Sequence, residues 1–155
     1  MELHLERIAS DIEGWLELFA DDAVVEFPYA GSVGRAGRMV GKAAIAGYFR
    51  GTPGVFRALR FRGLRLHVCA DPDVAIAEVH GSALVGPAGA AYEQDYVMVL
   101  RARAGQIVLY REYWDPTPAI AALGGTIRVA DGDGDIGTAM VVQIPWLPAT
   151  GTAPA

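Results

Sequence analysis

The chain has 155 residues, of which 52% are hydrophobic and 20% charged, and its formal net charge is −5. This composition excludes a disordered chain and suits one globular domain with a sizeable core. The acidic balance argues against a nucleic-acid partner, because phosphate binding needs a basic stripe. The densest group of basic residues is therefore interpreted as a solvated strand edge: Arg57, Arg60, Arg62 and Arg65.

We expect no targeting segment at the N-terminus. The first ten residues, MELHLERIAS, lack the apolar stretch of a signal peptide, and no apolar run reaches membrane-spanning length. One cysteine, Cys69, excludes an internal disulfide. We therefore expect a cytoplasmic protein without a membrane partner.

Helices are expected first along the chain. Helical spacing of apolar residues predicts a helix over about residues 11–20, preceded by a shorter one: Ile12, Trp15, Leu16 and Phe19. Residues 23–27 predict a short strand that stops at Pro28. After a glycine-rich loop, residues 41–50 predict another helix.

Strands follow the helices. We expect strands over residues 59–69, 74–84, 91–103 and 106–114, with a bulge at Gly63 in the first of them. A short helix should then begin with Asp115 as its N-cap and Pro116 in its first turn. Helices followed by a meander of strands predict an α+β domain, a curved antiparallel sheet closed by N-terminal helices over a pocket.

Residues 126–155 form a C-terminal extension beyond a domain of residues 1–125. Residues 140–147 are too apolar for a free tail, so we expect an added strand, a flap over the pocket or a contact with a partner subunit. Residues 131–135 have the lettering of a calcium loop, but Ile136 and Val142 stand where that loop needs a glycine and an acid. No metal site is predicted.

Strand register brings titratable residues together. A tight turn at 104–105 places Asp95 opposite Trp114 and Val97 opposite Glu112. A symmetric hairpin through residues 85–90 places His80 opposite Asp95 and Glu78 opposite Val97. Since alternate residues share a face, one face of three strands would carry the following set: Glu78, His80, Asp95, Tyr110, Glu112 and Trp114.

Carboxyls among apolar neighbours acquire shifted pKa values, so one group can act as an acid while a neighbour acts as a base. We predict Glu112 and Asp95 as the acid/base pair, with His80 and Glu78 relaying protons. The substrate-binding candidates are Trp114, Tyr110, Tyr48 and Glu26. The alternative for these strand residues is a face that simply contacts solvent, and for His80 and Tyr48 a structural role. The opposite face, which carries Tyr92, Tyr96 and Met98, is also semi-apolar and predicts a homodimer contact.

Four segments resemble the SnoaL-like branch of the nuclear-transport-factor-2-like superfamily over about residues 5–125: LFADDAVVEFP, MVGKAAIAGYFR, AEVHGSALV and YEQDYVMVLRARAGQIVLYREYWDPTPAIAALGG. The resemblance implies a cone-shaped α+β barrel with a deep pocket, dimeric through the outer sheet face. Among its subgroups the chain looks most similar to the phenazine A/B proteins. Glu112 matches the catalytic glutamate of that subgroup, whereas Tyr48 stands where its catalytic histidine is expected.

Most members of this superfamily act by acid/base chemistry without a cofactor. We therefore expect a cofactor-independent cyclase or isomerase acting on a small hydrophobic, polyketide-like intermediate of bacterial secondary metabolism. The alternatives are an epoxide hydrolase or epoxide-opening cyclase of the same fold, and a non-catalytic small-molecule binding domain.

Overall fold

The computed structural model describes residues 1–129 and 140–143, and it confirms the α+β class. The elements are α1 (Glu2–Ser10), α2 (Ile12–Glu17), β1 (Phe19–Glu26), the 3-10 helix η1 (Ala30–Val33), β2 (Arg38–Val40), α3 (Lys42–Phe49), α4 (Thr52–Val55), β3 (Phe56–His67), β4 (Val74–Val85), β5 (Ala90–Arg103), β6 (Gln106–Trp114), α5 (Pro116–Ala122), β7 (Thr126–Val129) and β8 (Met140–Gln143).

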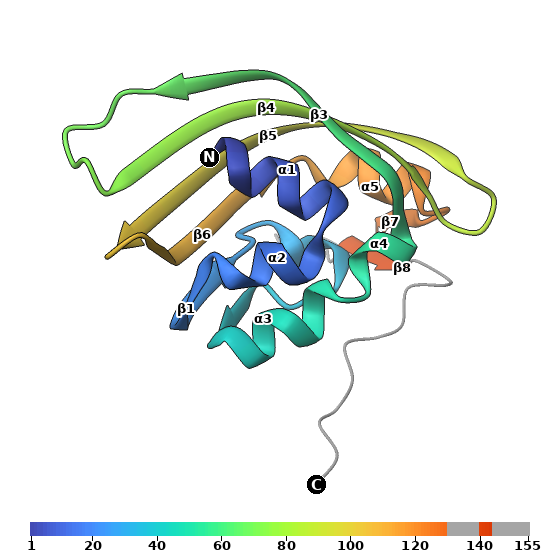
Figure 1. Cartoon of the computed structure of the whole chain (residues 1–155). Coiled ribbons are helices and arrows are strands. Elements are labelled where there is room, and N and C mark those ends of the chain that lie inside the picture. The colour runs from blue at the N-terminus through green and yellow to red at the C-terminus, as the bar shows by residue number, and fades with distance from the viewer. Residues whose placement is uncertain (130–139, 144–155) are drawn as a thin grey trace, which may run out of the picture.

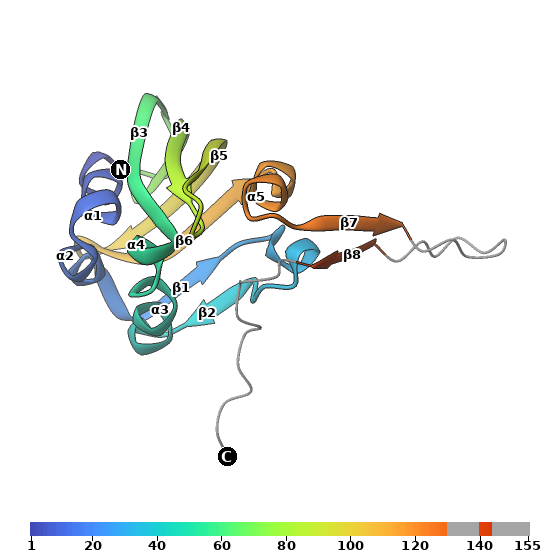
Figure 2. The same cartoon turned by 90° about the vertical axis from the view of Figure 1, so that its right-hand side faces the viewer.

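A curved six-stranded sheet dominates the fold, with the strand order β2-β1-β6-β5-β4-β3. Figure 1 shows β3, β4 and β5 arching over α1, and Figure 2 shows the helices on the inner side of the sheet. The sheet is open, with β2 and β3 at its two edges, so the barrel implied by the resemblance is not closed. Helices cover its concave face instead.

The sheet is antiparallel, as expected, except at one pair of strands. β1 runs parallel to β6, while the other four neighbouring pairs are antiparallel. The whole meander separates β1 from β6 in the sequence. No tight hairpin therefore constrains their relative direction.

The second helix is shorter than its apolar spacing predicts. Asp11 caps it by accepting a hydrogen bond from the Gly14 amide at 2.9 Å, and the helix ends at Glu17. Phe19 already belongs to β1, and the Ile107 amide donates to the Leu18 carbonyl at 2.8 Å. Pairing with β6 thus overrides the helical periodicity. In contrast, the last predicted helix begins as expected, with Asp115 as its N-cap.

The core lies between the helices and the inner face of the sheet. Its largest fully buried side chains come from both layers: Trp15, Phe19, Ile45, Met98 and Tyr110. His4 is buried with them and accepts a hydrogen bond from Trp15 Nε1 at 3.0 Å. This bond places the proton of neutral His4 on Nε2, which has no hydrogen-bond partner among the described residues and lies in a ring that packs edge-on against Tyr110.

Gly81 leaves room for two aromatic rings on the inner face of the sheet. A Cβ atom at this position would lie 2.8 Å from Cε2 of Tyr96 and 3.2 Å from Cε1 of Phe61. We expect Gly81→Ala to displace these rings and to lower the free energy of unfolding by about 1–3 kcal/mol. The matched control is Gly47→Ala in α3, where nothing lies within 4 Å, and helix propensity should raise stability by about 1 kcal/mol. Urea unfolding measures both, and equal stability of the two variants would contradict this role for Gly81.

Residues 126–129 and 140–143 form a second, two-stranded sheet. β7 pairs with β8 in antiparallel register, from Thr126 opposite Gln143 to Val129 opposite Met140. This hairpin projects beyond the α5 end of the main sheet (Figure 2). Two predicted features lie outside the described residues: the segment similar to a calcium-binding loop at 131–135, and residues 144–147 of the apolar segment.

Candidate active site

Register decides which residues meet, and it differs from the prediction at β6. The β4–β5 pairing is as expected, with His80 opposite Asp95 and Glu78 opposite Val97. Between β5 and β6, Ala102 pairs with Ile107 but Arg101 pairs with Leu109, so Val108 is an extra residue in β6. Because of this bulge, the β6 side chains after Val108 lie on the face opposite to the one predicted.

The predicted acid/base pair is therefore separated. Glu112 lies opposite Met98 and Trp114 opposite Tyr96, on the inner face of the sheet. Asp95 lies on the outer face, where its side chain is 91% exposed. The prediction that Glu112 and Asp95 share an enclosed space is wrong, and so is the assignment of the face of Tyr96 to a dimer contact.

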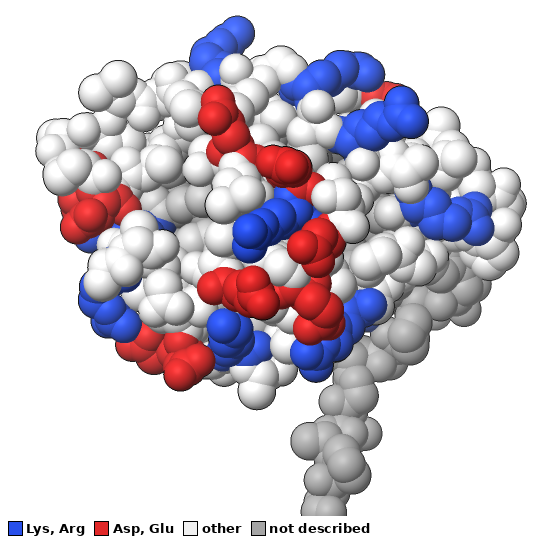
Figure 3. Space-filling view, in the orientation of Figure 1, with Lys and Arg blue, Asp and Glu red and all other residues white. Residues whose placement is uncertain are grey.

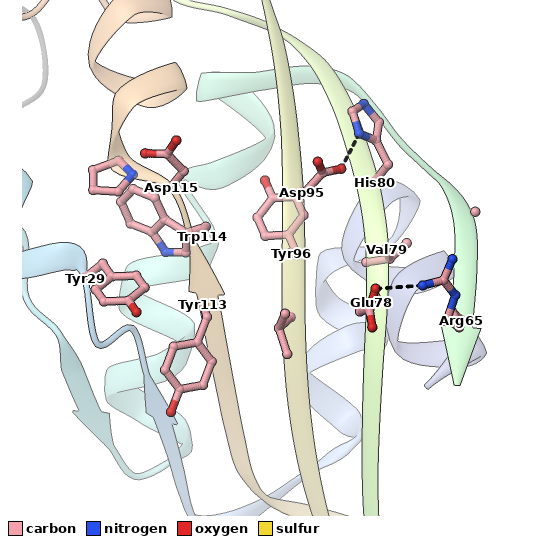
Figure 4. A pocket seen from close by; sticks show the side chains of 13 residues that line it. Tyr29, Arg65, Glu78, Val79, His80, Asp95, Tyr96, Tyr113, Trp114 and Asp115 are labelled. Atoms are coloured by element: carbon pink, nitrogen blue, oxygen red, sulfur yellow. Dashed lines mark hydrogen bonds and ion pairs between the residues drawn. The ribbon is translucent and has the colours of Figure 1, made fainter. Parts of the chain in front are cut away.

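The outer-face residues pair with one another instead. His80 Nδ1 lies 2.6 Å from Asp95 Oδ1, and His80 Nε2 lies 2.6 Å from Glu93 Oε2. Hydrogen bonds to Glu93 first and Asp95 second raise the pKa of His80. Figure 4 shows His80 and Asp95 turned toward each other and Glu78 turned toward an arginine of β3. These contacts are those of a solvated sheet face.

Glu26 also lies outside the pocket. It pairs with outer-face arginines of β6 and β2, accepting from Arg111 Nε at 2.7 Å and from Arg38 Nε at 3.3 Å. On the face of the molecule shown in Figure 3, acidic and basic side chains likewise lie next to each other. The prediction that Glu26 binds substrate is wrong, because β1 directs its neighbours Val25 and Phe27 inward.

Two hollows lie near these strands. The larger, about 710 Å³, is a wide depression on the outer face beside His80 and Asp95 (Figure 4). The smaller, about 330 Å³, lies on the inner face between the sheet, the helices and α5. The smaller one is the better candidate for acid/base catalysis, because partial removal from water shifts the pKa of a carboxyl toward neutral pH and Glu112 lines that cavity.

Apolar and aromatic residues make most of the inner cavity, with few polar groups among them. The lining residues that the structure describes are Ile8, Phe27, Val33, Arg35, Tyr48, Gly51, Thr52, Val55, Phe56, Leu59, Phe61, Tyr92, Tyr96, Glu112, Trp114, Ala119 and Leu123. Two predicted substrate-binding residues, Tyr48 and Trp114, line this cavity, although Trp114 lies opposite Tyr96 and not opposite Asp95 as predicted. Tyr110 does not line the cavity; it is fully buried behind Glu112.

Glu112 is the titratable centre of this cavity. Burial raises its pKa to about 7, against a smaller lowering by the hydrogen bond that the Tyr110 hydroxyl donates to Glu112 Oε2. Burial is also the main cause of raised pKa values at the tyrosines around it, and the Glu112 charge contributes to each of them: Tyr48, Tyr92, Tyr96 and Tyr110. Near neutral pH the site therefore holds one half-ionised carboxyl among protonated phenols.

Tyr92 and Tyr96 were not predicted as site residues. Their hydroxyls lie 3.2 Å apart, and both rings line the cavity. The signal was present in β5, whose even-numbered residues are bulkier and more apolar than the odd-numbered ones. Arg35 has no comparable signal, because it follows η1 in an irregular loop.

No helix among residues 1–129 and 140–143 has the length and apolar character needed to span a membrane. Within the same residues, no group of three or more His, Cys, Asp or Glu side chains is placed to hold a metal ion.

Comparison with known proteins shows the family to which the chain belongs. A sequence profile of the SnoaL-like domain matches residues 5–110. The chain belongs to the SnoaL-like domain family. An uncharacterized PhzA/B-like protein of Pseudomonas aeruginosa is 42% identical to this SnoaL-like chain over 120 residues, covering 77% of the chain and 84% of the relative.

Solved structures share the fold. A Bacillus subtilis protein assigned provisionally as an isomerase superimposes with a TM-score of 0.74 at 35% identity, covering 79% of this SnoaL-like chain and 88% of that protein. A phenazine biosynthesis-related protein from Pseudomonas aeruginosa superimposes with a TM-score of 0.69 at 17% identity, covering 86% of each chain. The likeness at 17% identity shows a shared fold, and similarity to the phenazine A/B subgroup rests on the PhzA/B-like relative that is 42% identical.

Proposed function

We propose that this SnoaL-like protein is a cofactor-independent acid/base enzyme, a cyclase or isomerase of a small carbonyl compound that forms an enolate. The proposal rests on Glu112, a carboxyl with a pKa of about 7 in an apolar cavity. Membership of the family and the similarity to the Bacillus subtilis protein assigned provisionally as an isomerase support a role of this type.

In the proposed reaction the Glu112 carboxylate removes a proton from the carbon beside the substrate carbonyl. The electron pair of that C–H bond forms the enolate, and a tyrosine hydroxyl of the cavity donates a hydrogen bond to the developing oxyanion. Protonated Glu112 then returns the proton. Return to a different carbon isomerises the substrate, whereas attack of the enolate on an internal carbonyl, with protonation of the resulting alkoxide, closes a ring.

A pKa near the working pH suits this shuttle. A base must be ionised in a useful fraction of molecules and must still bind the proton firmly enough to remove it. Glu112 meets both conditions at neutral pH. The Tyr110 hydroxyl holds its carboxyl in place, and Trp15 and His4 in turn pack against Tyr110.

Epoxide opening, the alternative that the sequence leaves open, uses two carboxyls in the pocket. Among the described residues that line the cavity, Glu112 is the acidic one, because Asp95 lies on the outer face. Proton transfer at carbon is therefore the better supported reaction. A polyketide-like substrate from secondary metabolism and a cytoplasmic location remain part of the proposal.

The test is exchange at carbon without any added cofactor. α-Tetralone deuterated beside its carbonyl should lose deuterium to water faster with the protein than in buffer at the same pH, observed by proton NMR. Saturable exchange supports an enzyme. Binding of α-tetralone without any acceleration would instead identify a binding domain.

The homodimer is also a proposal, now through the outer sheet face that the resemblance implies. Val97 and Leu84 on that face are exposed apolar residues, 40% and 46%. Sedimentation velocity of the protein and of Val97→Arg reports the association.

A further inference from the structure

We propose that the paired hydroxyls of Tyr92 and Tyr96 are the site at which the inner cavity binds the oxygen of its substrate, a flat ketone of one or two rings. This inference rests on the proposed function in that it names the substrate class, and two binding residues, of the same cavity. The observation behind it is a count of donors. Two hydroxyls that line the cavity share one hydrogen bond, so one of their two protons is left for a ligand.

Both tyrosines are held in place by the sheet. They lie four residues apart on the inner face of β5, and both are buried. Tyr92 packs edge-on against Phe56 of β3, and Tyr96 packs edge-on against Phe61 of the same strand. Gly81 of β4 leaves the space beside the Tyr96 ring. The two hydroxyls therefore have a defined position at the cavity wall before any ligand binds.

The hydroxyl pair has one donor more than the protein uses. The two oxygens lie 3.2 Å apart, and either can donate to the other. Each phenol carries one proton, and only one of the two protons can lie between the oxygens. In the described part of the chain, neither hydroxyl has a further hydrogen-bond partner. Because an unmet donor is unfavourable in a mostly apolar cavity, the second proton favours a ligand that brings an acceptor.

Both hydroxyls remain donors at neutral pH. Burial is the largest cause of the raised pKa of Tyr92 and of Tyr96, and the charge of Glu112 raises both further. A phenol that stays protonated donates a hydrogen bond and does not act as the base. The pair therefore suits a carbonyl oxygen, and its hydrogen bond strengthens as that oxygen gains negative charge in the enolate.

Glu112 completes the arrangement from the neighbouring strand. Tyr96 lies opposite Trp114 and Met98 lies opposite Glu112, so Tyr96 and Glu112 are diagonal neighbours on the inner face. Among the described residues, Glu112 accepts its hydrogen bond from Tyr110 and not from the pair. A ketone whose oxygen contacts the pair can thus present the carbon beside its carbonyl to Glu112.

The walls define the rest of the ligand. Aromatic rings of β3 and β5 line the cavity, and its volume of about 330 Å³ lies at the small end of ligand pockets. α-Tetralone matches these features, because it has a flat apolar body, one acceptor oxygen and C–H bonds beside the carbonyl.

The experiment observes the carbonyl of bound α-tetralone directly. With carbon-13 at the carbonyl, the NMR signal of the bound ketone should lie downfield of its signal in cyclohexane, because the oxygen accepts a hydrogen bond. The double variant Tyr92→Phe/Tyr96→Phe removes both protons and should cancel most of this shift. Affinity should fall about 2–10-fold, the worth of one hydrogen bond between neutral groups. The variant should fold, since both partners of the hydrogen bond become apolar groups of nearly the same shape.

Tyr113→Phe is the matched control. It makes the same chemical change at a tyrosine of β6 that lies opposite Val97 on the outer face, packs against Tyr29 and does not line the cavity. We expect its carbonyl shift and affinity to equal those of the unmodified protein. Absence of α-tetralone binding, an unshifted carbonyl in the unmodified protein, or an equal shift in the double variant would overturn the role of the hydroxyl pair.

Glu112→Gln separates this inference from the catalytic proposal. The variant keeps both hydroxyls, so the carbonyl shift should persist while α-tetralone exchange is lost. A shifted carbonyl in an unmodified protein that does not accelerate exchange would overturn the catalytic proposal alone. Accelerated exchange with an unshifted carbonyl would instead overturn the oxygen site alone.

Discussion

Glu112→Gln should lower the rate of α-tetralone exchange by about 10²–10⁴-fold, the usual contribution of one general acid/base. Glutamine has nearly the same shape and still accepts a hydrogen bond from Tyr110, but it cannot carry the transferred proton. Binding of the ketone should therefore persist while exchange disappears. The loss should appear in kcat rather than in KM.

Asp95→Asn provides the matched control. The substitution makes the same chemical change at the other carboxyl of the predicted acid/base pair. The Asp95 side chain, however, is 91% exposed on the outer face. We expect exchange by Asp95→Asn to equal that of the unmodified protein. Equal losses in the two variants would contradict the assignment of catalysis to the inner cavity.

The second large effect concerns stability and pH, because His4 and Glu112 titrate in opposite senses. Burial, followed by the charge of the N-terminus, lowers the pKa of His4 from 6.5 to about 3. Between pH 6.5 and about 3 the unfolded chain therefore binds a proton at His4, whereas the folded protein does not. The stability contributed by neutral His4 is complete above pH 6.5 and is lost as the pH falls from 6.5 through about 3.

Glu112 has the opposite sign. Its folded pKa of about 7 exceeds the unfolded value of 4.5, so the folded protein binds the extra proton between these values. The stability associated with protonated Glu112 is complete below pH 4.5 and is lost as the pH rises through about 7. Between pH 4.5 and 6.5 the contributions of His4 and Glu112 therefore offset each other.

Single variants should separate the effects of His4 and Glu112 on the pH dependence of stability. Each group changes the free energy of unfolding by about 1.4 kcal/mol per pH unit. In Glu112→Gln only the His4 effect is left, so this variant should lose about 2–3 kcal/mol of stability, relative to the unmodified protein, on acidification from pH 6.5 to 4.5. His4→Gln, which keeps an acceptor for Trp15 Nε1, should instead gain relative stability over the same range. Urea unfolding at several pH values measures both, and parallel pH profiles of the three proteins would refute the opposed titrations.

Much of the fold could be predicted because local signals and tertiary structure agree. β6 has the predicted bounds, and Asp115 caps α5 with its side chain accepting from the Thr117 amide at 2.8 Å. The β4–β5 register followed correctly from a symmetric hairpin. Each of these features depends on residues close together in the sequence.

The site could be predicted only in part because it depends on parity across a bulge. Val108 is an ordinary strand residue, and nothing in its type indicates that β6 accommodates an extra residue there. A register error of one residue in the prediction placed Glu112 on the face of Asp95, whereas in the structure it shares the face of Tyr96. The more apolar set on β5 identifies the inner face independently, and it is the better guide because burial is what a sheet face must achieve.

We expect Glu112 to be half-protonated near neutral pH inside the cavity. Carbon-13 NMR of the glutamate carboxyls, with the Glu112 signal assigned by its absence in Glu112→Gln, measures this directly as a function of pH. We predict a midpoint at about 7. A midpoint near 4.5, the ordinary value for a glutamate, would contradict the account.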